Sequence, residues 1–96
     1  TICFKGKPLS EGIINALGAC RRHGHEVMFA SARPIRDLLP VLPESMRAYT
    51  MVGGNGAFVA RFGETIEVTA FASKIVEGIR QIITVFQLPY LVDSPW

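Results

Sequence analysis

The chain has 96 residues, of which 49% are hydrophobic and 19% charged, with a net charge of +2 at pH 7. This length suits one small domain or part of a larger one, and the scattered basic residues predict no nucleic-acid partner. No apolar run is long enough to cross a membrane and nothing at the start looks like a signal peptide, so we expect a cytoplasmic protein without membrane contact.

The N-terminal part predicts a loop followed by an amphipathic helix. Residues 1–8 combine a short apolar start with a turn-rich stretch that contains two lysines, a glycine and a proline. Ser10 is a good helix N-cap, and apolar residues recur at helical spacing over residues 11–23. Gly24 can take the left-handed conformation with which many helices end.

A strand is expected next, and polar residues stand at its end. Residues 27–30 form an apolar run of the length of a strand buried on both faces. In open α/β sheets, ligands bind beyond the carboxyl ends of the strands, where the N–H groups of the following helix point. Ser31 could there donate a hydrogen bond to a phosphate, and Arg33 could clamp a second group. Both could equally be ordinary loop residues between the strand and a helix that Pro34 opens.

The middle of the chain predicts a second strand and a hairpin. A short helix should end or kink at Pro40. Residues 49–52 predict another buried strand, which runs into the glycine-rich stretch 53–56. Such a stretch allows positive φ angles and a close approach of the backbone to a ligand, although a plain turn explains it equally well. Residues 57–61 and 64–68 alternate like the two strands of a β-hairpin.

The strongest helical pattern covers residues 72–88. Its apolar stripe consists of Ile75, Val76, Ile79, Ile82, Ile83 and Phe86. We expect this stripe to pack in a core, with Ser73 as the helix cap and Pro89 at the end. Residues 90–92 predict a further strand. Because the chain starts without methionine and stops in a fresh apolar run, we expect it to be part of a longer protein.

Three segments in order resemble the haloacid dehalogenase superfamily, and within it the Cof-type sugar-phosphatase branch with an α/β cap. Thr1 fits the threonine of that family's Asp-x-Asp-Gly-Thr motif. Residues 30–34, Ala-Ser-Ala-Arg-Pro, resemble its second motif, often Ala-Thr-Gly-Arg-Pro, and residues 54–57, Gly-Asn-Gly-Ala, resemble its Ser-Asn-Gly-Ala. Two positions depart from the pattern, because Ala32 replaces a glycine and Gly53-Gly54 replace Thr-Ser.

The resemblance implies an α/β fold. It implies a partial Rossmann-like parallel sheet over residues 1–70, without its first strand, and the start of an α+β cap over residues 71–96. It also implies a Mg²⁺-dependent phosphatase that hydrolyses small phosphate esters, such as sugar phosphates, through an aspartyl-phosphate. The nucleophilic aspartate, the general acid/base and most magnesium ligands would lie outside this chain. The 96 residues alone are therefore expected to be inactive.

The same resemblance implies roles for five residues. Ser31 would hydrogen-bond the transferring phosphoryl group, and Thr1 would shape the nucleophile loop. Arg33 would touch the substrate or hold its own loop as a salt-bridge partner. Asn55 and Gly56 would face the cleft between core and cap, where a small phosphorylated substrate binds.

Two other functions stay open on the sequence. The chain could be a catalytically silent phosphate- or nucleotide-binding α/β module that keeps Ser31 and the loop glycines as an anion cradle. It could also be a partner-binding structural domain that docks the apolar stripe of residues 75–86 on another chain. The identity of the substrate and the oligomeric state are open as well.

Overall fold

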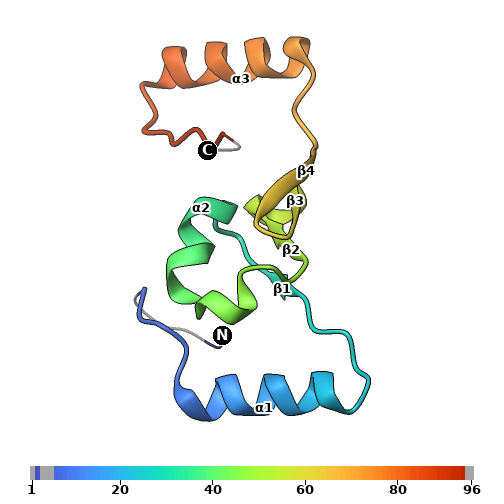
Figure 1. Ribbon diagram of the computed structural model, residues 1–96. Coiled ribbons are helices and arrows are strands. Elements are labelled where there is room, and N and C mark those ends of the chain that lie inside the picture. The colour runs from blue at the N-terminus through green and yellow to red at the C-terminus, as the bar shows by residue number, and fades with distance from the viewer. Residues whose placement is uncertain (1, 3–5, 95–96) are drawn as a thin grey trace.

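The computed structural model describes residue 2 and residues 6–94 (Figure 1). Thr1, expected in the nucleophile loop, lies outside the described residues. The elements are α1 (Glu11–Arg22), β1 (Phe29–Ala30), α2 (Ile35–Leu38), two 3₁₀ turns (Leu39–Val41 and Glu44–Met46), β2 (Met51–Gly53), a third 3₁₀ turn (Gly54–Gly56), β3 (Phe58–Arg61), β4 (Glu64–Val68) and α3 (Ser73–Phe86).

The four strands form one sheet in the order β1-β2-β3-β4. β1 and β2 are parallel, with Phe29 opposite Met51, whereas β2, β3 and β4 pair antiparallel. The parallel pair is joined by a crossover that contains α2, as a parallel connection requires. The predicted α/β fold class, with a partial Rossmann-like sheet, is therefore confirmed.

The first helix forms as its sequence predicts. The Ser10 side chain accepts a hydrogen bond from the Ile13 N–H at 3.4 Å and so caps α1. Gly24 follows the helix with a φ of 86°, in the left-handed region. Ile13 and Leu17 are half-buried and pack against the core, so α1 covers it with its apolar face.

The predicted hairpin is confirmed as well. β3 and β4 are joined by Phe62 and Gly63, whose φ angles are both positive, at 54° and 80°. Two consecutive positive φ angles are typical of the two-residue hairpin turn that matches the strand twist. Phe58 and Ala60 on β3 are buried, because they point to the core face of the sheet.

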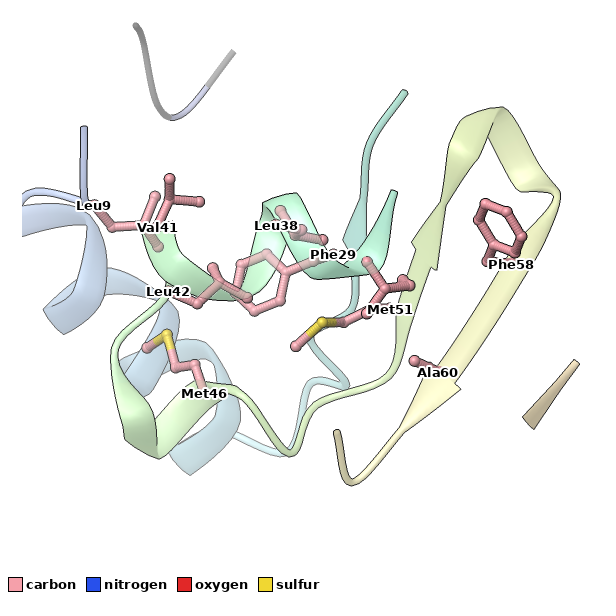
Figure 2. Close-up of a cluster of buried hydrophobic side chains, with 10 residues drawn as sticks. Leu9, Phe29, Leu38, Val41, Leu42, Met46, Met51, Phe58 and Ala60 are labelled. Atoms are coloured by element: carbon pink, nitrogen blue, oxygen red, sulfur yellow. The ribbon is translucent and has the colours of Figure 1, made fainter. Parts of the chain in front are cut away.

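Ten apolar side chains form the core between the sheet and the α2 region. Figure 2 shows the Phe29 ring in the middle of this cluster, between Leu42 and Met51. The ring also stacks on Tyr49, with 5.9 Å between the ring centroids, and the Arg21 guanidinium lies over the same tyrosine. The buried residues are Leu9, Phe29, Ile35, Leu38, Val41, Leu42, Met46, Met51, Phe58 and Ala60.

The expectation that residues 27–30 form a strand buried on both faces is wrong. Only Phe29 and Ala30 pair as a strand, and only Phe29 is buried, while Met28 is 58% exposed. β1 is an edge strand in the described sheet, with β2 as its one neighbour. An apolar run thus indicated a strand correctly, but the elements around it leave one of its faces uncovered.

The expectation that the stripe of α3 packs in a core is also wrong for the described chain. α3 contains no buried residue, and Ile79 and Phe86 are 42% and 69% exposed. Ser73 is the first helical residue and not the cap, a position that Ala72 takes without a side-chain hydrogen bond. Residues 90–92 are exposed and form no strand. Helical periodicity shows that an apolar face exists, but it does not show which surface covers that face.

The described chain is elongated, because α3 stands away from the sheet (Figure 1). Its radius of gyration is 16.5 Å, against about 13 Å expected for a compact domain of this size. The division into a core over residues 1–70 and a cap start over residues 71–96 stays a prediction. Within the described part of the chain, none of the helices combines the length and the hydrophobicity needed to span a membrane.

The cap of α1 gives a first prediction. We expect Ser10→Ala to lower the free energy of unfolding by about 1 kcal/mol, because the Ile13 N–H loses its acceptor. Urea denaturation measures this change. Ser73→Ala is the matched control, since the Ser73 side chain caps no helix, and it should have almost no effect. Equal losses for both variants would contradict the capping role of Ser10.

Candidate functional site

The candidate site lies where β1 and β2 end. Because the two strands are parallel, their carboxyl ends meet at the same edge of the sheet. Ser31 follows β1 and donates its N–H to the Val52 carbonyl at 2.9 Å, while the Asn55 N–H donates to the Ser31 carbonyl at 3.3 Å. These bonds hold the loop after β1 against the loop after β2.

A shallow pocket of about 420 Å³ opens between these two loops. The structure therefore brings Ser31, Asn55 and Gly56 together, whereas Arg33 does not line the pocket. The lining residues are Ala30, Ser31, Ala32, Val52, Asn55 and Gly56.

The Ser31 hydroxyl forms one hydrogen bond within its own loop, as an acceptor. Its Oγ accepts a hydrogen bond from the Arg33 N–H at 3.0 Å. A serine hydroxyl can accept and donate at the same time, so this bond leaves its proton available for an acceptor in the pocket. Ser31 is therefore suited to donate a hydrogen bond to an anionic oxygen.

Arg33 acts through its backbone in the described chain. Its N–H binds Ser31 Oγ, and its carbonyl accepts from the Gly54 N–H at 2.8 Å. The Arg33 side chain is exposed, and it forms no ion pair with any residue in the described part of the chain. The salt-bridge alternative for Arg33 thus has no partner among residues 6–94.

The backbone conformation at position 55 favours an asparagine. Its φ is 55°, in the left-handed region that asparagine tolerates better than most residues. Gly54 and Gly56 beside it also have positive φ, at 56° and 99°. The expected positive φ angles in this stretch are confirmed, and they turn the chain sharply so that Asn55 and Gly56 reach the pocket.

Gly53 allows the two loops to touch. A Cβ on Gly53 would lie 2.8 Å from Ile35 Cδ1 and 2.9 Å from the Arg33 carbonyl oxygen. Real Cβ atoms do not approach other atoms so closely, so the position has room for glycine alone. Gly54 has a steric reason as well, because a Cβ on Gly54 would lie 2.7 Å from the Phe58 ring.

The expected helix N-terminus does not contribute an anion site. α2 follows the loop at Ile35, but it has four residues and continues as the 3₁₀ turn Leu39–Val41. Pro40 lacks an N–H and ends the α-helix, as predicted. So short a helix has little dipole, and the polar groups that reach the pocket come from the two loops instead.

The pocket residues do not match a magnesium site. Mg²⁺ prefers carboxylate oxygens, and no carboxylate lines this pocket. Within the part of the chain that the structure describes, no three histidine, cysteine or acidic side chains are grouped for a metal.

Sequence reasoning missed the apolar half of the pocket. Ala30, Ala32 and Val52 line it together with the polar residues. Ala30 and Val52 are paired neighbours in the sheet, so the parallel pairing of the two predicted strands was the signal that could have found them.

The mixed sheet, with a pocket at the carboxyl ends of its parallel strands, has the architecture of an α/β protein. The family model of the haloacid dehalogenase-like hydrolases matches residues 1–94, and the chain belongs to this family. Comparison with curated proteins and with solved structures found no match. The superfamily expected from the sequence is confirmed, and the family supports a hydrolase in general.

The close contact at Gly53 gives a second prediction. We expect Gly53→Ala to lower the free energy of unfolding by about 1–3 kcal/mol, because the new methyl group overpacks against Arg33 and Ile35. Thermal or urea unfolding measures the loss. Gly78→Ala is the control, since a Cβ there meets no atom within 4 Å and a helical alanine should not destabilise. A Gly53→Ala protein as stable as the control would contradict the contact.

Proposed function

We propose that this chain is part of a Mg²⁺-dependent phosphatase of the Cof-type sugar-phosphatase branch, which hydrolyses small phosphate esters through an aspartyl-phosphate. One observation carries the proposal. In a chain of the haloacid dehalogenase-like hydrolase family, Ser31 and Asn55 lie in one pocket at the carboxyl ends of β1 and β2. We also propose that the protein is located in the cytoplasm.

Ser31 is proposed to bind the transferring phosphoryl group. Its hydroxyl already accepts from the Arg33 N–H, so it meets a phosphoryl oxygen as a donor. The hydrogen bond strengthens as negative charge builds up on that oxygen in the transition state, and such a donor accelerates the reaction.

The other residues have supporting roles in the proposal. Asn55 and Gly56 contact the substrate from the loop after β2, where they line the pocket. Arg33 is exposed and lies in the loop after β1, at the same edge of the sheet as the pocket. In the proposal, its side chain contacts a part of the substrate that extends beyond the pocket. Thr1 is proposed to shape the nucleophile loop.

The remaining chemistry is assigned to residues outside this chain. Most ligands of Mg²⁺ and the nucleophilic aspartate are proposed to lie outside this chain, and the residues that the structure describes hold no group of three metal-binding side chains. The 96 residues alone are accordingly expected to be inactive.

The third prediction tests Ser31. In the full-length protein, we expect Mg²⁺-dependent release of phosphate from some members of a panel of sugar phosphates and other small phosphate esters. Ser31→Ala should lower kcat/KM about 10²-fold or more, as for the loss of an electrostatic stabiliser. Ser45→Ala, a change at an exposed serine in the Glu44–Met46 turn, is the control and should leave the rate unchanged.

The same assay separates the proposal from its alternatives. Phosphate binding without turnover of any ester would favour a catalytically silent phosphate- or nucleotide-binding module. Neither turnover nor phosphate binding, in a folded full-length protein, would favour a partner-binding structural domain. Turnover that Ser31→Ala does not affect would keep the hydrolase and remove Ser31 from its phosphate site.

The fourth prediction separates the two roles of Asn55. Asn55→Gly keeps the positive φ and should leave the free energy of unfolding almost unchanged. If the side chain contacts the substrate as proposed, the same variant raises KM about fivefold, because one hydrogen bond is lost. Steady-state kinetics and urea unfolding of the full-length variant measure both quantities. An unchanged KM would leave Asn55 with its backbone role alone.

A further inference from the structure

The α3 unit, defined as residues 73–94, is not held to the rest of the chain by burial. No residue of α3 is buried, and the connection after β4 is exposed over residues 69–72. At the start of this connection, the Thr69 N–H donates a backbone hydrogen bond to the carbonyl of Ala57, which directly precedes β3, at 2.7 Å. Polar contacts must therefore contribute to where the unit stands.

Arg36 supplies such contacts across a long stretch of sequence. Its Nη2 lies 3.3 Å from Asp93 Oδ1, and its Nη1 donates to the Ser94 carbonyl at 3.2 Å. Figure 1 shows the C-terminal segment running back beneath α3 toward α2. One guanidinium thus binds two groups of the α3 unit through charge-assisted hydrogen bonds.

The core side of this contact is anchored by buried residues and lies close to the pocket loop. Arg36 lies on α2 between Ile35 and Leu38, which are both buried in the core. Ile35 also packs against Gly53, at the contact that joins the two pocket loops. Arg36 therefore belongs to α2, the helix that directly follows the Ser31 loop.

The contact is suited to opening and closing. The side chains of Arg36 and Asp93 are 40% and 34% exposed, so water competes for both. Exposed ion pairs of this kind shift an equilibrium by about 1.5- to 5-fold, and salt weakens them further. Such a pair biases the position of the α3 unit without locking it.

We propose that the Arg36–Asp93 ion pair is a reversible, salt-sensitive latch that ties the α3 unit to α2 beside the Ser31 loop. With the latch closed, the C-terminal segment is held at α2. With the latch open, the exposed connection over residues 69–72 lets the unit swing away. The latch does not depend on the proposed phosphatase activity.

The test is a distance measurement in the full-length protein. Spin labels are attached through Asn15→Cys on α1 and Gln81→Cys on α3, both exposed, after Cys3 and Cys20 are replaced by serine. Pulsed electron–electron double resonance then gives the distribution of label distances, and from it the ratio of the latched to the open population. We expect Asp93→Asn to lower this ratio about 1.5- to 5-fold at low salt, and high salt to lower it similarly in the parent protein.

Asp37→Asn is the matched control. Asp37 also pairs with Arg36, at 3.6 Å from Nε, but it belongs to α2 itself, so its loss should leave the ratio unchanged. The exchange variant Arg36→Asp with Asp93→Arg should restore the ratio. The proposal is overturned if Asp93→Asn leaves the population ratio unchanged, or if Asp37→Asn lowers it as much as Asp93→Asn does.

Discussion

The structure depends on the close approach of the Ser31 loop to the end of β2. Gly53 carries no side chain, so the Arg33 carbonyl and Ile35 can lie directly on it. Backbone hydrogen bonds from Gly54 and Asn55 to the Ser31 loop complete the contact. A chain with any larger residue at Gly53 would have to separate these loops, and the pocket between them would change shape.

The apolar core below supports this contact. Phe29 on β1 and Met51 on β2 are paired neighbours, and both side chains are buried with Ile35 in one cluster. Packing in such a core is dense, so a shift of one strand end is felt by its neighbour. The buried cluster therefore positions both strand ends, and through them Ser31 and Asn55.

The α3 unit follows a different principle. Its helix forms from local preferences and leaves its apolar stripe exposed in the described chain, with Ile82 54% exposed. Half-exposed polar contacts at Arg36, and not burial, join it to α2. The core and the α3 unit thus differ in how firmly their elements are held, because buried apolar area contributes far more than an exposed ion pair.

The sequence by itself determined what depends on neighbours along the chain. The Ser10 cap, the turn at Phe62 and Gly63 and the end of a helix at Pro40 are local, since the groups that interact lie within a few residues. The three segments in order also predicted the family. Only the tertiary structure decided that Met28 is exposed and that Val52 joins Ser31 in one pocket. Burial and pocket lining depend on residues distant in sequence, which periodicity does not record.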